Sequence, residues 1–294
     1  MDGNKRLTVG LATYDDFDGV YFTVQSLRLH HGEALEQIEI LVVDNNPRSP
    51  HGQAVAEFMK LVPHGRYLPN REKVGTAVRN LVFDAARTPY VLCLDCHVLL
   101  CPGALNRLLD FYRENPLSGD LLQGPLLPDS FAPQKIVTHM EPRWDSCMFG
   151  AWGTDPRGLH PDAPPFEIPM HGLGLFACRK DAWLRFNERF RGFGAEEGYI
   201  HEKYRQAGRR TLCLPFLRWL HRFIRPAGAN YPLKLQDRIH NYIVGWLELG
   251  LDTTPILDHF QHWGGRERWE RMRAELTRQF AAQAGSPAVT RHAA

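Results

Sequence analysis

Short apolar runs alternate with segments of helical periodicity over the first 115 residues. Apolar runs rich in strand-forming residues cover 7–13, 38–46 and 89–95, and GRYLPN (65–70) is typical of a short strand followed by a turn. Between and after them, apolar residues recur at helical spacing in 20–31, 51–62, 75–86 and 101–115. Strands that alternate with helices in this way favour a parallel sheet. The sequence therefore predicts an α/β fold with a mostly parallel central sheet that is flanked by helices.

The pattern changes between residues 118 and 170, where prolines are frequent and apolar runs are short. We expect long loops with short strands there, and such a stretch in a compact domain often faces a substrate. We interpret Trp144 and Trp152 within it as packing residues. Further strands and helices are expected over 171–183, 190–208, 210–215, 236–249 and 267–280. The expected organisation is a domain of residues 1–225 and a helical C-terminal extension of residues 226–294.

The composition is that of a globular protein, since 44% of the 294 residues are hydrophobic and 23% are charged. No run approaches the roughly 18 apolar residues that a transmembrane helix needs. Acidic residues follow the first apolar run at once, so that run does not form a signal-peptide core. We therefore expect a cytoplasmic protein that acts on soluble acceptors or meets a membrane only at its surface.

The cysteines and the net charge argue against a disulfide-stabilised protein, a zinc ribbon and a protein that coats nucleic acid. The six cysteines are expected to be reduced thiols, because the chain is long and carries no secretion signal. Cys93 and Cys96 form a C-x-x-C pair, but the second pair that a zinc ribbon needs is absent. The net charge of +2 is too balanced for a chain that coats nucleic acid, although it allows a local basic patch.

Two predicted strands end in residues that are candidates for binding a ligand or a metal. Asp44 closes the run 38–46, and the stretch LCLDCHVLL (92–100) contains Asp95 and His97, two positions apart. Alternation in a strand places such positions on one face. Ligands of parallel α/β sheets bind at the carboxyl ends of the strands, where these residues fall. Asp95 and His97 fit either a metal site or an ordinary polar strand end.

Several short motifs follow one another in a specific order over residues 7–223. They are Thr13-Tyr14, VVDNN with Asp44, Asn70 followed by Gly75-Thr76-Ala77-Val78-Arg79-Asn80, LDCH, MHGLGLFACRK, and GAEEG. This order resembles that of glycosyltransferases of the family-two type. The resemblance implies a GT-A (Rossmann-like) fold, with the nucleotide-sugar half in about residues 1–100 and the acceptor half in about 101–225.

The metal motif departs from the usual family pattern, because LDCH ends in His97 rather than in a second Asp. In this respect it resembles the D-x-H motif of polypeptide N-acetylgalactosaminyltransferases, which also use a later His; WLHRF offers His221 in that place. The resemblance implies Mn²⁺ (or Mg²⁺) bound by Asp95, His97, His221 and the diphosphate of a UDP-sugar. Imidazole ligands favour Mn²⁺ over Mg²⁺. As one of 14 histidines, His221 also fits an unrelated role.

The same resemblance implies a set of donor-binding residues. We expect Asp44 to bind the uracil or the ribose, and Lys73 and Arg79 to meet phosphate or the base edge. The full set is Thr13, Tyr14, Asp44, Lys73, Gly75, Arg79 and Asp95.

Glu196 and Glu197 precede a predicted helix, and either can take the proton of an acceptor hydroxyl. They can also simply favour the helix N-terminus, where acids interact well with the helix dipole. Family-two enzymes generally invert and use the second acid, here Glu197. The N-acetylgalactosaminyltransferases retain and have Asn there, so Glu197 favours inversion, whereas the D-x-H motif favours retention.

The acceptor is left open by the sequence. Residues 203–225 contain seven basic residues and no acid, which fits arginines around a diphosphate. It also fits a polyanionic acceptor such as DNA with a hydroxymethylated base, and a glycan or protein acceptor is not excluded.

We therefore expect a metal-dependent hexosyl- or N-acetylhexosaminyltransferase that moves a sugar from a UDP-sugar to a hydroxyl. The alternative is a catalytically silent GT-A-like module that binds a nucleotide or nucleic acid. A nucleotidyltransferase would usually carry a glycine-rich basic loop after its first strand, whereas ATYDDFDG (12–19) is acidic. Oligomeric state is not predicted.

Overall fold

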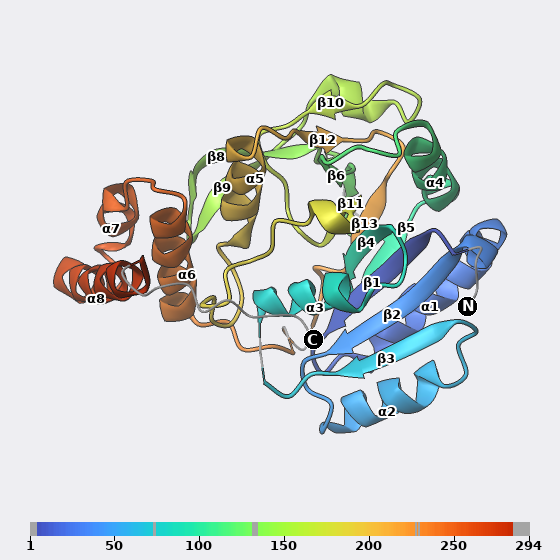
Figure 1. Cartoon of the computed structure of the whole chain (residues 1–294), viewed down its shortest axis with the longest axis horizontal. Coiled ribbons are helices and arrows are strands. Elements are labelled where there is room, and N and C mark those ends of the chain that lie inside the picture. The colour runs from blue at the N-terminus through green and yellow to red at the C-terminus, as the bar shows by residue number, and fades with distance from the viewer. Residues whose placement is uncertain (1–4, 73–74, 131–134, 227, 229, 285–294) are drawn as a thin grey trace.

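The fold is organised around one large mixed sheet, in a computed structural model that describes residues 5–72, 75–130, 135–226, 228 and 230–284. Within these ranges the sheet has the strand order β10-β12-β6-β11-β4-β1-β2-β3 (Figure 1). Its strands are β1 (Leu7–Thr13), β2 (Ile38–Asp44), β3 (Gly65–Pro69), β4 (Tyr90–Asp95), β6 (Leu121–Gln123), β10 (Phe166–Glu167), β11 (Leu175–Arg179) and β12 (Thr211–Cys213).

The first four strands are parallel to one another and confirm the predicted α/β pattern. β1 pairs with β2 on one side and with β4 on the other, and β3 extends the sheet beyond β2. β11 then pairs with β4 in the antiparallel direction. The carboxyl ends of β1, β2 and β4 therefore lie side by side at one edge of the sheet, where the sequence places its candidate residues.

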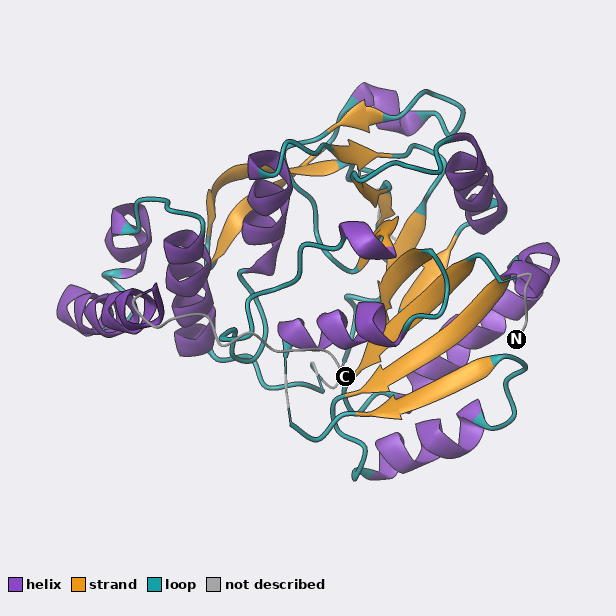
Figure 2. Ribbon diagram, viewed as in Figure 1, coloured by secondary structure: helices purple, strands orange, loops and turns teal. Residues whose placement is uncertain are grey.

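Helices cover the sheet and create two hydrophobic cores (Figure 2). Successive residues of one strand enter different cores: Leu92 belongs to the core with α1 and α4, and Cys93 to the core with α3 and α6. This explains the continuous apolar runs of the buried strands. The helices are α1 (Phe17–His30), α2 (Pro50–Met59), α3 (Arg79–Ala85), α4 (Ala104–Glu114), α5 (Glu196–Gln206), α6 (Leu235–Glu248), α7 (Thr254–Phe260) and α8 (Arg266–Ala284).

The expected C-terminal helices are present, and they extend a core of the sheet. Ile239 and Ile243 of α6 are fully buried in the core that also contains Val91 of β4. None of the helices in the described ranges is long and apolar enough to cross a membrane.

LCLDCHVLL is divided between two strands, whereas the alternation argument for Asp95 and His97 treated both residues as part of one strand. β4 ends at Asp95, Cys96 and His97 form a turn, and β5 (Val98–Leu100) begins in a different sheet. That second sheet has the order β5-β13-β7, with β13 at Trp219–His221 and β7 at Leu126–Leu127. An apolar run alone does not reveal that the chain changes sheets within it, because both of its parts are buried.

The proline-rich stretch contains the short strands that were expected and one hairpin that was not. β8 (His139–Asp145) and β9 (Met148–Gly153) pair in the antiparallel direction and form a separate two-stranded sheet. The buried side chain of Met140 on β8 contributes to its packing.

Gly75 joins the segment before α3 to the segment before α5. Its backbone has φ +119° and ψ −162°, a region that is essentially restricted to glycine. Thr76 N–H donates to the Gly192 carbonyl oxygen at 2.9 Å. A Cβ at position 75 would lie 1.9 Å from that same oxygen. The absence of a side chain therefore allows the two segments to meet beside the candidate site.

We expect Gly75→Ala to destabilise the fold by about 2 kcal/mol or more, because it adds a backbone clash to an unfavourable φ. Gly103→Ala is the matched control: its φ is +80°, and nothing lies within 4 Å of an added Cβ, so about 1 kcal/mol is expected. Urea unfolding measures both free energies. Equal losses would contradict the importance of the Gly75–Gly192 contact.

Candidate functional site

A cavity of about 460 Å³ opens at the carboxyl ends of β1 and β4. Thr13 and Asp95, the last residues of these strands, line it together with Glu196 and Glu197 at the start of α5. This is the place where ligands bind in α/β sheets. The cavity is large enough to hold much of a nucleotide sugar.

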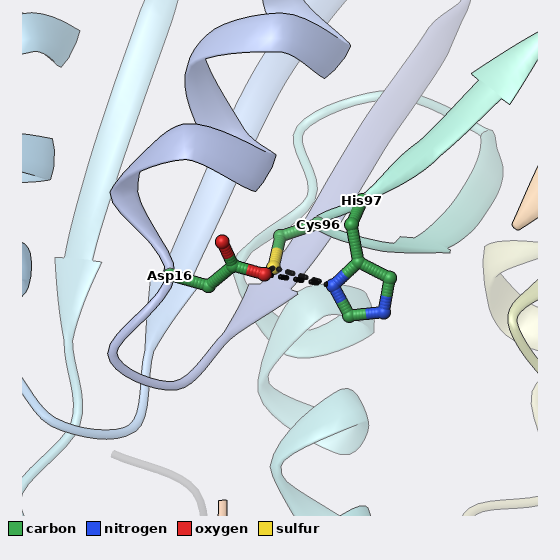
Figure 3. A group of neighbouring side chains, drawn as sticks. All are labelled: Asp16, Cys96 and His97. Atoms are coloured by element: carbon green, nitrogen blue, oxygen red, sulfur yellow. Dashed lines mark hydrogen bonds and ion pairs between the residues drawn. The ribbon is translucent and has the colours of Figure 1, made fainter. Parts of the chain in front are cut away.

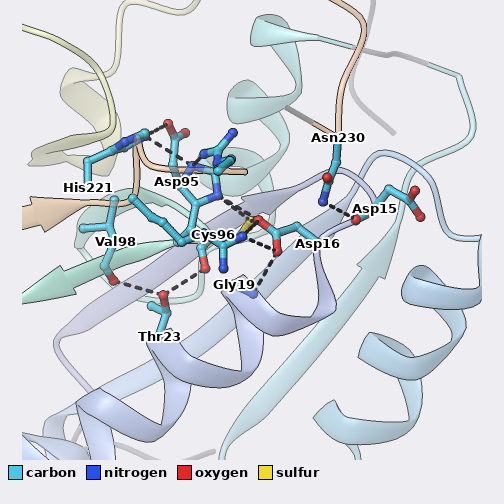
Figure 4. A network of polar contacts seen from close by, with 12 residues as sticks. Asp15, Asp16, Gly19, Thr23, Asp95, Cys96, Val98, His221 and Asn230 are labelled. Carbon is cyan, nitrogen blue, oxygen red and sulfur yellow. Dashed lines mark hydrogen bonds and ion pairs between the residues drawn. The ribbon is translucent and has the colours of Figure 1, made fainter. Parts of the chain in front are cut away.

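Asp95, His97 and His221 converge at the floor of this cavity. Their potential ligand atoms all lie within 4.8 Å of one another. His97 Nε2 is 3.2 Å from His221 Nε2. His221 Nε2 is in turn 3.5 Å from Asp95 Oδ2, and Figure 4 shows these two side chains facing each other. Neighbouring ligands of an octahedral cation with bonds of about 2.1 Å lie about 3 Å apart. The donor set and its spacing therefore fit a divalent metal.

The three residues come together through a turn and a strand pairing. β13 pairs with β5 so that His221 lies opposite Val98, and His97 is the residue just before Val98. Asp95 ends β4 on the other side of the turn. The predicted proximity of Asp95 and His97 is present, but strand alternation is the wrong reason for it, because His97 lies outside β4.

Arg79 neutralises the carboxylates around this group. Its Nη2 donates to Asp95 Oδ1 at 2.7 Å, and its Nη1 lies 3.5 Å from Glu196 Oε1. Arg79 is only 7% exposed, so the ion pairs are poorly screened by water. Burial opposes ionisation of Asp95, but Arg79 and His221 hold its pKa well below the usual range. Asp95 therefore stays anionic.

Glu196 and Glu197 begin α5 and face the cavity. Burial, together with the nearby Glu196 carboxylate, raises the pKa of Glu197 to about 8. Glu196 is 6% exposed, and its Oε2 has no hydrogen-bond partner among the described residues. The Glu197 carboxyl is thus poised near neutral pH, and Glu196 has a buried oxygen without a partner among the described residues.

The comparison with known proteins agrees with this geometry. Residues 8–181, more than half of the chain, match the sequence model of glycosyl transferase family 2. The chain belongs to glycosyl transferase family 2. No functionally curated protein matches the sequence significantly.

Solved structures place the family-2 chain among GT-A glycosyltransferases in fold. GalNAc-T7 with UDP, GalNAc and Mn²⁺ is 15% identical, with a TM-score of 0.67, and the match covers 94% of this chain and 55% of that one. The mannosyltransferase PcManGT from Pyrobaculum calidifontis, in complex with GDP-Man and Mn²⁺, is 15% identical, with a TM-score of 0.56; the match covers 97% of this chain and 78% of that one. The chain thus spans about half of the GalNAc-T7 chain.

Most of the predicted donor-binding residues border the cavity. Thr13, Tyr14, Gly75, Arg79 and Asp95 all line it. Lys73 lies outside the described residues.

Asp44 is fully buried and does not line the cavity, whereas the next residue, Asn45, does. Asp44 accepts hydrogen bonds from Asn46 N–H and from the Tyr67 hydroxyl, both at 2.8 Å. Burial raises the pKa of this carboxyl. A role of Asp44 at the uracil or ribose remains a prediction.

Sequence reasoning did not find several residues at the family-2 site. Asp16 Oδ2 lies 2.9 Å from His97 Nδ1, and Arg225 Nη2 lies 2.5 Å from His97 Nε2. Trp152, interpreted as a packing residue, is 45% exposed and lines the cavity, as does Phe223, which is 53% exposed. The acidic loop after the first strand was a signal for Asp16, but nothing in the sequence singled it out.

The basic run 203–225 makes contacts mainly within the protein. Each cationic head donates to a protein acceptor; the pairs include Lys203 with Glu248, Arg210 with Asp120 and Arg218 with the Leu159 carbonyl. Arg222 donates to Asp16, and the remaining cations are Arg205, Arg209 and Arg225, which donate to Glu202, the Ala182 carbonyl and His97. The count of basic residues is therefore a weak argument for a polyanionic acceptor.

We expect Arg79→Met to lower the free energy of unfolding by about 3 kcal/mol, because it leaves Asp95 and Glu196 buried without their counter-charge. Arg185→Met is the control: the Arg185 and Asp84 side chains of that ion pair are 44% and 48% exposed, so a loss below about 1 kcal/mol is expected. Urea unfolding without added metal measures both. Similar small losses would contradict a structural role of the buried ion pairs.

Proposed function

We propose that the chain is a metal-dependent glycosyltransferase that moves a sugar from a UDP-sugar to a hydroxyl acceptor. The observation that carries the proposal is the convergence of Asp95, His97 and His221 beside a cavity at the strand ends. Membership of glycosyl transferase family 2 supports it. So does the likeness in fold to structures named with UDP or GDP-Man and Mn²⁺.

Asp95, His97 and His221 would hold the cation. When bound, it neutralises the charge that develops on the diphosphate leaving group. Two imidazoles and one carboxylate favour Mn²⁺ over Mg²⁺. Arg79 keeps Asp95 ionised and fixed through the 2.7 Å hydrogen bond.

The donor nucleotide is proposed to bind in the half formed by residues 1–100. Polar contacts are available from Thr13, Tyr14 and Asn45. These residues line the same cavity as the candidate metal ligands. The acceptor would enter from the half formed by residues 101–225, to which the helical extension 226–294 contributes through the cavity-lining residues Tyr231 and Arg238.

Glu197 is proposed to take the proton from the acceptor hydroxyl, with inversion at the anomeric carbon. Its raised pKa, about 8, makes it a stronger base than an ordinary carboxylate once it is deprotonated. Glu196 Oε2, which has no partner among the described residues, would accept a hydrogen bond from a substrate hydroxyl.

The rim of the cavity favours an acceptor with a flat or ring-shaped face. The Trp152 and Phe223 ring centroids are 6.5 Å apart, and both rings are about half exposed. Exposed aromatic side chains provide large contact areas at a low entropic cost. A sugar ring or an unstacked base fits such a rim, so a glycan and a modified base in DNA are the two acceptor classes to compare.

We expect His97→Ala and His221→Ala each to abolish the Mn²⁺-dependent rise in melting temperature that UDP-sugars produce, because each removes a ligand. His160→Ala, an exposed histidine, should retain the full shift. Thermal-shift measurements across a UDP-sugar panel provide the readout. Unchanged shifts in both ligand variants would show that the metal binds elsewhere.

We expect kcat/KM to rise with pH up to about 8, because the raised pKa keeps Glu197 protonated below that value and a base must be deprotonated. Glu197→Gln should lose about 10²-fold or more in rate, keep the Mn²⁺–UDP thermal shift, and lack this pH dependence.

Glu196→Gln is the matched variant for the second acid. It should weaken donor binding more than it changes the pH dependence. If Glu196→Gln removes the pH dependence and Glu197→Gln does not, the roles are reversed. NMR of the anomeric proton of the product tests inversion directly.

A further inference from the structure

His97 lies between two sets of polar groups, one at each ring nitrogen. On the Nε2 side are His221 Nε2 at 3.2 Å and Arg225 Nη2 at 2.5 Å. On the Nδ1 side are Asp16 Oδ2 at 2.9 Å and Cys96 Sγ at 3.5 Å (Figure 3). Two groups of potential metal ligands therefore share this one imidazole. A neutral imidazole has a single N–H, so only one of its nitrogens can bind a cation.

The surroundings of Asp16 make it an acceptor of hydrogen bonds. Asp16 caps α1, and its Oδ1 accepts from Gly19 N–H at 2.9 Å. Arg222 Nη2 lies 3.2 Å and 3.3 Å from its two oxygens. The residue is 6% exposed, so these partners are not replaced by bulk water. A carboxylate held among donors has no proton to offer, and the hydrogen on His97 must point toward it.

We propose that Asp16 is a positioning residue that fixes His97 in the tautomer protonated at Nδ1, which leaves the Nε2 lone pair on the side of His221 and Arg225. Arg225 donates to that lone pair here and would have to move aside for a cation. Carboxylates commonly orient metal-binding histidines in this way. The part of the inference that concerns metal rests on the proposed function. The part that concerns the tautomer does not.

The same contacts argue against a second metal site at Asp16, Cys96 and His97. The Asp16 oxygens already accept hydrogen bonds from Gly19 N–H and from Arg222. The hydrogen at His97 Nδ1 occupies the lone pair that the cation would need. Cys96 Sγ lies 3.7 Å from Asp16 Oδ2 and completes the polar surroundings of the carboxylate.

The contact of Asp16 with Arg222 also links Asp16 to the segment that contains His221. Arg222 follows His221 directly, and its backbone N–H donates to the His97 carbonyl oxygen at 3.2 Å. Asp16 thus contacts His97 itself and the residue next to His221. Asp16 therefore orients His97 and, through Arg222, restrains the residue next to His221.

Asp16→Asn separates this role from helix capping. Asn caps helices about as well as Asp, so its amide oxygen can keep the bond to Gly19 N–H. The amide nitrogen then takes the place of Oδ2 and presents a donor to His97 Nδ1. We expect the hydrogen to move to Nε2, and Mn²⁺ affinity to fall at least about tenfold. Asp16→Ser, which keeps a capping oxygen, should also weaken Mn²⁺ binding.

The experiment uses the full chain with ¹⁵N-labelled histidine at pH 8. Proton–nitrogen correlation spectra of the metal-free protein report the tautomer, and His97→Gln assigns the signal. Electron paramagnetic resonance of free Mn²⁺, with and without UDP, gives the affinity. Asp18→Asn is the matched control, because Asp18 is an exposed acid in the first turn of the same helix; neither readout should change.

An Nδ1–H signal in the wild type that moves to Nε2–H in Asp16→Asn, with weakened Mn²⁺ binding and unchanged urea unfolding, supports the inference. An Nε2–H tautomer in the wild type overturns it, as does wild-type Mn²⁺ affinity in both Asp16 variants. The expected tautomers without any Mn²⁺ binding to the wild type would support the orienting role and count against the proposed function.

Discussion

The site depends on the point at which the chain leaves the main sheet. β4 belongs to the large sheet and β5 to the small one, and only the turn of Cys96 and His97 separates them. Because β13 pairs with β5, this change of sheet brings His221 back beside His97. If β4 continued as one long strand, the pairing with β5 that places His221 opposite Val98 would be lost. The geometry of the candidate metal group is therefore a property of topology.

Buried charge is the second constraint on the site. Asp95 and Glu196 come from opposite halves of the chain, and Arg79 lies between them with little exposure to water. Such pairs add little net stability, but they penalise any arrangement that separates the partners. The contact of Gly75 with Gly192 joins the same two segments through the backbone. Charge and backbone together hold the acids of α5 against the end of β4.

The sequence predicted the four parallel strands well. β1, β2 and β4 are continuous apolar runs that the cores bury, and β3 is a short, partly buried strand that was predicted next to a turn. It also placed Asp95, His97 and His221 in one group, through the order of motifs rather than through geometry. It could not show that LCLDCHVLL divides between two sheets, since both parts are apolar. It could not identify Asp16 among three nearby acids, because the cap of α1 and the position of Arg222 select that carboxylate. Trp152 was assigned to packing for a similar reason: exposure is decided by the fold of the hairpin.

The separation of the two histidines along the chain has a consequence for stability. His97 and His221 are 124 residues apart in sequence, yet their ring nitrogens nearly touch. A cation bound by both would act as a reversible cross-link that closes this loop and joins the two sheets. Closing a long loop removes much of the freedom of the unfolded chain. The metal concentration of the surroundings would then set how tightly the two halves of the fold stay together.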